Sequence, residues 1–378
     1  MSSVHHMPQI GKPDVAGMTA VAFVAGLLAL LVAAGCGGGS TSANGGGNGQ
    51  VAASVSGTIK AGTGPRAIAV DSGTNKIYVA DFGTIPTGAP CSPSGADVET
   101  IDGATQSTTS TGIGGRPQNP YAAALNPANH TLYVITEAYW NGPAKGGECE
   151  RLVDNILGFD TTSLQGTWGP SLGGAGIDVN PTTGTIYVTR GGAVEVWDSN
   201  WNQVATIPVG SVPIGMAVNA TSNKIYVANS GSNDVSVIDG ASNSVAATIT
   251  DPNAVSPVAV AVNPTTNTIY VANCRSNNLS VIDGATNSVT ATIPVGTCPS
   301  GVAVDSQTDF IYVANAGDSQ NGTPGNVTVI NGATNATTTL SDPNAVIPVA
   351  VAANSVTNKI YVANSGSNNV TVINGAHD

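Results

Sequence analysis

Charged side chains are scarce in this sequence, and basic ones are the scarcest. Asp, Glu, Lys and Arg make up 9% of the residues, and 11 basic residues stand against 23 acidic ones, for a formal net charge of −12. A chain this acidic, with its basic residues scattered singly, lacks the positive patch that binds a phosphate backbone. The composition therefore predicts no nucleic-acid partner.

Helical periodicity is also missing, because Ala alternates with Val and Thr at period two rather than at helical spacing. What is present is a short apolar run ending in Tyr-Val, which occurs seven times. Its tyrosines are Tyr78, Tyr133, Tyr187, Tyr226, Tyr270, Tyr312 and Tyr361, separated by 55, 54, 39, 44, 42 and 49 residues. A period in the forties built from strands predicts an all-β fold, a β-propeller with one four-stranded blade per repeat and seven blades.

One regular repeat, Pro257 to Pro294, indicates how a blade forms. Its four β-branched or apolar runs are separated by clusters of Asn, Pro, Gly, Ser and Thr, and each run has about the length of a usual strand. Pairs such as Asp283-Gly284 combine a residue that bonds its own backbone with one that tolerates positive φ. We expect antiparallel meanders joined by tight hairpins.

The two ends of the repeat region predict how the ring closes. The last repeat holds three strands, whereas the sequence from Ala53 to Pro65 matches the fourth-strand sequence of other repeats, such as Asn287 to Pro299. We expect Ser54 to Lys60 to pair with Asn369 to Asn374, which leaves no unpaired edge between the first and last blades.

The first fifty residues predict export. Val15 to Gly35 is almost unbroken apolar sequence, Cys36 follows it, and a Gly-rich linker occupies residues 37–50. Ala33-Ala34-Gly35-Cys36 resembles a bacterial lipobox, so residues 1–36 are interpreted as a lipoprotein signal peptide with Cys36 as the lipidated residue. The alternative is an uncleaved membrane helix. Either reading tethers the propeller of residues 51–378 to a membrane.

The other cysteines fit an oxidising compartment. In a propeller, the loops joining second to third strands and the loops joining blades lie on one face, here called the top face. Cys91, Cys149, Cys274 and Cys298 all fall in such loops. We predict the disulfides Cys91–Cys149 and Cys274–Cys298, with four free thiols as the alternative. Neither CxxC spacing nor a nearby His favours zinc, and no metal site is expected.

Catalytic chemistry finds little support. Past the leader only His130 and His377 occur, and both are expected on the face opposite the top. The positions where inner strands begin form a mostly apolar ring: Arg66, Tyr121, Gly176, Ile214, Val258, Ser300 and Val349. Hydrolytic, lyase or redox propellers need several convergent polar groups. We predict no catalytic residue and no cofactor.

Two polar sets recur by blade. The aspartates Asp102, Asp198, Asp239 and Asp283 are explained by hairpin geometry. The asparagines Asn229, Asn273, Asn315 and Asn364 end second strands, and there backbone capping is weighed against a polar ring for a ligand.

The departures from the repeat are more informative than the repeat itself. Phe82 to Asp97 and Glu137 to Asp154 are insertions in top-face loops of blades 1 and 2. The second contains Tyr139 and Trp140, the best candidates for a binding platform, unless they only cap the blades. Arg116 and Arg190 fall near the same face, and with Arg66 and Tyr121 they complete the candidate binding set.

The segments KIYVANSGSNDVSVIDG (Lys224 to Gly240) and TIYVANCRSNNLSVIDGATNSVTATIPVG (Thr268 to Gly296) resemble the YVTN-type propeller repeat of bacterial and archaeal surface proteins and YncE-like periplasmic proteins. The resemblance covers residues 51–378. It implies a seven-bladed propeller in the cell envelope and says little about activity, because the motif residues are scaffold.

Two functions remain open. The first is a non-catalytic module, monomeric and tethered in the envelope facing the periplasm or the cell surface, that binds a protein or glycan partner through its top-face loops. The second is an enzyme of lactonase or lyase type with its active site in the central funnel.

Overall fold

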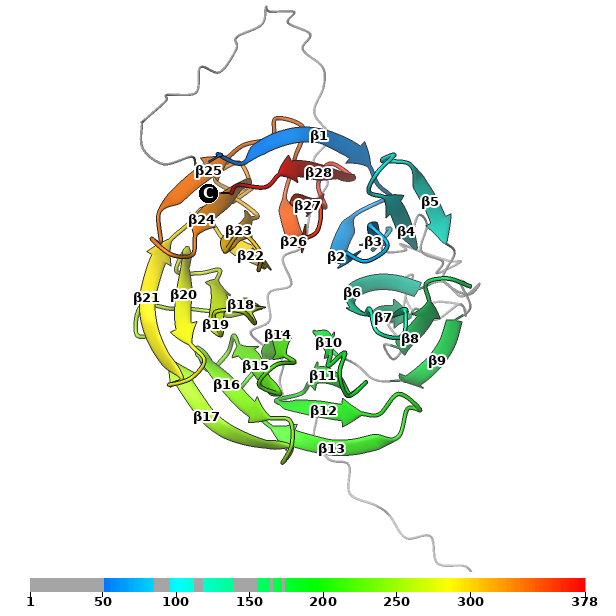
Figure 1. Ribbon diagram of the computed structural model, residues 1–378, viewed down its shortest axis with the longest axis vertical. Helices are drawn as coiled ribbons and strands as arrows, with labels where there is room; N and C mark the ends of the chain where they lie inside the picture. Colours follow the sequence, from blue (N-terminus) through cyan, green and yellow to red (C-terminus); the bar gives the residue numbers. More distant parts are fainter. Residues whose placement is uncertain are drawn as a thin grey trace, which may run out of the picture. The chain divides into compact units, whose positions relative to one another are not determined.

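A computed structural model of the protein describes residues 51–84, 96–111, 118–138, 155–163, 166–171 and 174–377. These residues form 28 strands, arranged as seven four-stranded antiparallel sheets around a ring (Figure 1). The predicted all-β, seven-bladed propeller is confirmed. Within the described ranges there is no helix long and apolar enough to cross a membrane.

Six blades take four consecutive strands each, with the first strand innermost. Blade 1 contains β2 (Pro65–Asp71), β3 (Lys76–Asp81), β4 (Asp97–Asp102) and β5 (Thr108–Thr111); blade 2 contains β6 (Gln118–Asn126), β7 (Thr131–Ala138), β8 (Asn155–Asp160) and β9 (Gly166–Ser171); blade 3 contains β10 (Ile177–Val179), β11 (Ile186–Arg190), β12 (Ala193–Trp197) and β13 (Gln203–Pro208). Blade 4 contains β14 (Pro213–Asn219), β15 (Lys224–Asn229), β16 (Asp234–Asp239) and β17 (Ser244–Thr250); blade 5 contains β18 (Pro257–Asn263), β19 (Thr268–Asn273), β20 (Asn278–Asp283) and β21 (Ser288–Pro294); blade 6 contains β22 (Pro299–Asp305), β23 (Phe310–Asn315), β24 (Asn326–Asn331) and β25 (Thr337–Leu340).

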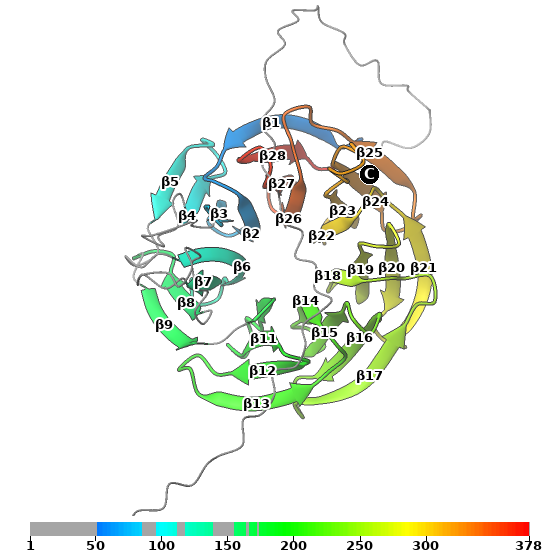
Figure 2. The ribbon, with the colours of Figure 1, turned by 180° about the vertical axis from the view of Figure 1, so that it is seen from behind.

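Blade 7 is completed from the other end of the chain. It contains β26 (Pro348–Asn354), β27 (Lys359–Asn364) and β28 (Asn369–Asn374), and its outer strand is β1 (Ser54–Lys60) (Figure 2). The strands β1 and β28 pair from Ser54↔Asn374 to Lys60↔Asn369, with one register shift between Val55 and Gly57. The predicted closing strand is therefore confirmed with the predicted boundaries.

The Tyr-Val runs are the packing layers between blades. The five tyrosines of blades 3 to 7 are among the largest fully buried side chains, and the tyrosines of blades 1 and 2 are buried too. Tyr226 and Ala228 of β15, for example, pack with Ile269 and Val271 of β19 in the next blade. Alternate residues of one strand thus serve opposite neighbours, which explains why nearly every position in these runs is apolar.

The hairpins between third and fourth strands correct one expectation. As predicted, Asp239 bonds its own turn, because its Oδ1 accepts hydrogen bonds from the N–H groups of Ala241 (2.8 Å) and Ser242 (3.1 Å). The residue with positive φ, however, is Asn243 (φ 50°) rather than Gly240. A Cβ at Gly240 would lie 2.6 Å from the Asn223 Oδ1. The glycine is needed for this close approach rather than for its backbone freedom.

On the face opposite the top, side-chain hydrogen bonds join consecutive blades. The residue at the end of an inner strand, or directly after it, donates its amide Nδ2–H to the left-handed turn residue of the next blade. The pairs are Asn180 to Asn223 (2.9 Å), Asn219 to Asn267 (2.9 Å), Asn263 to Asp309 (2.7 Å) and Asn354 to Asn75 (2.9 Å). Between blades 1 and 2 the equivalent residues are Asp71 and His130, with 3.9 Å between the His130 Nδ1 and the Asp71 Oδ2. His130 lies on this face, as expected.

Candidate functional site

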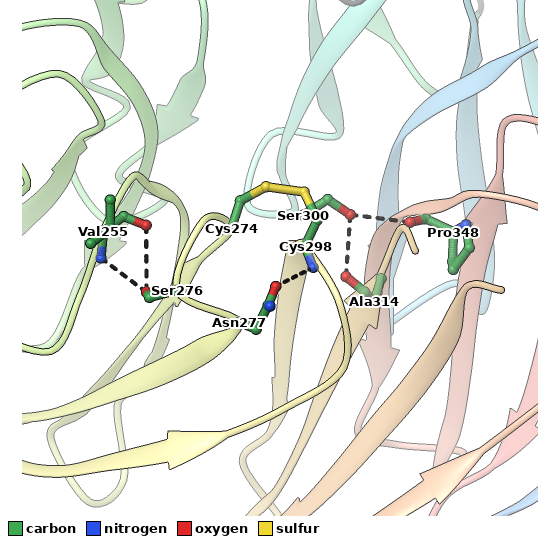
Figure 3. The surroundings of a disulfide bond; sticks show 8 residues. All are labelled: Val255, Cys274, Ser276, Asn277, Cys298, Ser300, Ala314 and Pro348. Atoms are coloured by element: carbon green, nitrogen blue, oxygen red, sulfur yellow. Dashed lines mark hydrogen bonds between the residues drawn. A yellow bond between two sulfur atoms is a disulfide. The ribbon is translucent and has the colours of Figure 1, made fainter. Parts of the chain in front are cut away.

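The inner strands approach one another closely near the top face. A Cβ at Gly176 would collide with the carbonyl oxygen of Ile214, and one at Gly215 with that of Val258. The Ser300 hydroxyl lies 3.1 Å from the Pro348 carbonyl oxygen of the next blade and 3.2 Å from that of Ala314 (Figure 3). The polar group of this ring position thus joins strands β22, β23 and β26.

The other ring and rim candidates are engaged as well. Arg66 is exposed, with its guanidinium carbon 3.7 Å from the centre of the Phe82 ring, a cation–π contact. The Tyr121 hydroxyl donates a hydrogen bond to the Gly174 carbonyl oxygen at the entry to blade 3. Arg190 forms an ion pair with the buried Glu195 at 2.9 Å. The structure thus places three predicted residues on the top side of blades 1 to 3. The remaining candidates Tyr139, Trp140, Arg116, Cys36 and the pair Cys91–Cys149 lie outside the described residues.

The predicted Cys274–Cys298 disulfide is confirmed, with 4.0 Å between the two Cα atoms (Figure 3). It links the loop after β19 to the connection between blades 5 and 6. The Cys298 N–H also donates to the Asn277 Oδ1 (2.8 Å), and the Ser276 Oγ accepts from the Val255 N–H (2.9 Å). This part of the top face is therefore held by one covalent bond and several hydrogen bonds.

The asparagines that end second strands build a polar triplet in each of blades 4 to 7. The Asn229 Nδ2 donates to the Asp234 Oδ1 (2.7 Å) and the Ser236 Oγ (2.9 Å) of the third strand. Asn273, Asn315 and Asn364 make the same two kinds of bond in their own blades. The amides chiefly tie together two strands of one blade, a role that neither earlier explanation described.

Blade 1 breaks this triplet, and the sequence analysis missed it. The equivalent residues are Asp81, Asp97 and Glu99, three carboxylates where blades 4 to 7 have an amide donor and at most one carboxylate. Asp81 is 0% exposed, and neither of its oxygens has a hydrogen bond of normal geometry. The Gly62 N–H faces Asp81 and Glu99, and it offsets only part of the free energy that is lost by burying these carboxylates.

The electrostatic consequence is a carboxyl group that holds its proton. Burial, followed by the charges of Glu99 and Asp97, raises the pKa of Asp81 to about 8. Burial also raises the pKa of Asp97 and of Glu99. Among the described residues, no three His, Cys, Asp or Glu side chains are placed to hold a metal ion. Because its pKa is raised to about 8, the Asp81 carboxyl group is protonated near neutral pH.

A second exceptional carboxylate lies on an inner strand. Asp178 of β10 occupies the position filled by alanine in other blades, such as Ala217 opposite Tyr226. It accepts hydrogen bonds from the N–H groups of Val179 and Val218, both at 2.8 Å, and so bridges blades 3 and 4. Burial raises its pKa to about 6. Aligning the repeats residue by residue would have found both carboxylate sites.

Comparison with known proteins supports the fold. No family model matches the chain, and no curated protein matches it. Among solved structures, the chain is similar to Kuenenia stuttgartiensis Hydrazine Synthase, with 20% sequence identity and a TM-score of 0.62 over 83% of this chain and 96% of that chain. At this identity the likeness concerns the fold alone. The resemblance to YVTN-type repeats stays a prediction.

Proposed function

We propose that the protein is an exported, envelope-tethered propeller that binds a protein or glycan partner through the top face of blades 1 and 2, without catalysis. The observation that carries the proposal is where the repeat is broken. Asp81 ends β3 and Asp97 begins β4, and Ala138 ends β7 while Asn155 begins β8. The same connection in blade 5 runs only from Asn273 to Asn278. Long loops on a rigid scaffold are the usual carriers of recognition.

The location outside the cytoplasm is supported by the disulfide and by the leader sequence. A disulfide such as Cys274–Cys298 persists in oxidising compartments. The apolar run, Cys36 and the Gly-rich linker are the pattern of a lipid-anchored envelope protein. The resemblance to YVTN-type repeats points to the same compartment.

A binding role is favoured over a lactonase or lyase by the way the polar groups are used. Ser300, Asp178 and Tyr121 bond to backbone groups of neighbouring strands. Asp81 has the most perturbed pKa of these carboxylates, but it is fully buried, so a substrate cannot reach it in this conformation. Arg66, by contrast, is exposed and covers the buried Phe82 ring, so it offers a cationic group on the top side of blade 1.

The test is partner capture from envelope extract with the intact protein and with the double variant Tyr139→Ala/Trp140→Ala. Aromatic anchors dominate such interfaces, so we expect the double variant to lose the partner at least about tenfold while its melting curve is unchanged. Val255→Ala is the matched control, because Val255 is 42% exposed in a top-face loop far around the ring. If all three proteins retained the partner equally, the proposed binding location would be wrong. If the double variant unfolded, the Tyr139 and Trp140 side chains would have a packing role instead.

A further inference from the structure

The top-face loop of blade 6 contains an exposed Asn-Gly pair. This loop joins β23 to β24, and its tip is closed by two backbone hydrogen bonds between Asp318 and Thr323, at 2.9 and 2.8 Å. The Asp318 carboxylate organises the tip. It accepts hydrogen bonds from the Gln320 N–H (2.9 Å), the Asn321 N–H (3.2 Å) and the Asn321 side-chain amide. One of these three hydrogen bonds therefore depends on Asn321 being an amide.

Asparagine followed by glycine has a reaction open to it that other pairs largely lack. The backbone nitrogen of the glycine can attack the side-chain Cγ of the asparagine, because no Cβ obstructs it. The new N–C bond closes a cyclic imide, and the side-chain nitrogen leaves as ammonia. Water then opens the ring at either carbonyl, giving aspartate or its β-linked isomer. No other reactant is needed.

Three Asn-Gly pairs lie in the described part of the chain, and their glycine nitrogens differ. The Gly332 N–H donates to the Asp309 carbonyl oxygen and the Gly375 N–H to that of Asn358, both at 2.8 Å. Both nitrogens would have to break a hydrogen bond before attacking. The Gly322 N–H makes no hydrogen bond to any described residue, and both Asn321 and Gly322 are exposed.

The side chains differ in the same direction. The Asn331 Oδ1 accepts three hydrogen bonds from its own turn, from the Ala333 N–H, the Thr334 N–H and the Thr334 hydroxyl. The Asn321 side chain is held only by its bond to Asp318. Fewer hydrogen bonds must therefore break before Asn321 can turn its Cγ toward the backbone nitrogen of Gly322.

We propose that Asn321 is a site of spontaneous deamidation, and that its conversion opens the top-face loop of blade 6. The product carries a carboxylate where the amide donated to Asp318. Two negative charges then face each other at hydrogen-bond distance, and one of the bonds that hold the tip becomes a repulsion. The loop changes with the age of the protein, without an enzyme.

The rate is tested by incubating the intact protein in mildly alkaline buffer and mapping its peptides by mass spectrometry. The reactions of Asn331 and Asn374, followed in the same digests, are internal controls. We expect aspartate and its β-linked isomer to accumulate at Asn321 at least about tenfold faster than at either control, since the glycine nitrogen of each control must first break a hydrogen bond. Equal rates, or a faster reaction at Asn331, would overturn the proposal.

The consequence is tested with Asn321→Asp, which installs one product directly. Backbone amide exchange at Asp318 and Thr323 should accelerate, because these N–H groups form the bonds that close the tip. The matched control is Asn331→Asp, which places at a blade 6 hairpin the residue that Asp239 and Asp283 supply in blades 4 and 5. Unchanged exchange at Asp318 and Thr323 in Asn321→Asp would show that the loop tolerates the charge and would refute the opening.

Discussion

At the ends of the second strands, the choice of residue is constrained by how many hydrogen bonds its buried side chain can form. Asn229 and Asp81 occupy the same place in their blades, but the amide donates two hydrogen bonds and the carboxylate can donate none unless it is protonated. With the amide, the buried triplet is hydrogen-bonded and stabilises the blade. With the carboxylate, buried oxygens lack a donor, and this lowers the stability of the blade. Blade 1 therefore depends on pH in a way that blades 4 to 7 do not.

Replacing Asp81 with Asn should stabilise the protein, and more so at high pH. The folded state raises the pKa of Asp81 to about 8 from its usual 3.8, so it binds a proton that the unfolded chain has released. Stability from this group is complete below pH 3.8 and is lost as pH rises to about 8. We expect Asp81→Asn to gain about 2 kcal/mol or more near pH 9 and progressively less toward pH 5, measured by denaturant unfolding across pH.

Asp283→Asn is the control for this measurement. Its turn N–H groups lower the pKa of Asp283, so the same chemical change there should bring no gain at high pH. If the advantage of Asp81→Asn were the same at every pH, the protonated carboxyl group would be ruled out.

At the scale of the strand, the decisive feature is how closely the inner strands approach. A Cβ at Gly215 on β14 would collide with the Val258 carbonyl oxygen and lie 2.9 Å from the Ala259 Cα. Both atoms belong to backbone that the next blade holds in place. The glycine is therefore a spacing element between blades 4 and 5.

Gly215→Ala should destabilise the protein by about 2 kcal/mol or more, because two sheets must move apart to admit the methyl group. Gly57→Ala is the matched strand variant, since a Cβ there meets nothing within 4 Å and Ala removes backbone freedom from the unfolded chain. Its melting temperature should stay the same or rise slightly. Similar losses in both variants would mean that strand propensity, rather than spacing, explains the glycine.

The strands were largely predictable, and the site was not, for one physical reason. The alternation of side chains along a strand and the residues that form turns are local features of the sequence. The strand from Thr268 to Asn273 could therefore be assigned from adjacent residues. The Asp81 triplet can be recognised only when the repeats are aligned with one another, because Asp97 lies opposite Asp81 across an inserted loop. The role of Gly240 was misjudged for the same reason, since the atom that excludes a side chain belongs to Asn223.

At the scale of the whole propeller, stability depends on the joint between the first and last blades. Deleting residues 51–60 removes β1 and exposes the edge of β28 along its length. It also removes Thr58, whose hydroxyl donates to Asp342 (3.3 Å), and Ile59 from the core shared by blades 7 and 1. We expect a sharp fall in melting temperature together with self-association through the free edge, measured by calorimetry and sedimentation. An unchanged melting curve would contradict the closure.

The same joint sets the order in which the ring can be completed. The Ser56 hydroxyl bonds to the Val372 carbonyl oxygen, 316 residues later, so the strand that is synthesised before every blade waits for a partner that is synthesised after all of them. Closing a loop of that length adds an entropic cost that the other blades, built from neighbouring segments, do not bear. Six blades can thus assemble in the sequence of their synthesis, while folding of the seventh is the late step in which premature pairing of the first strand has to be avoided.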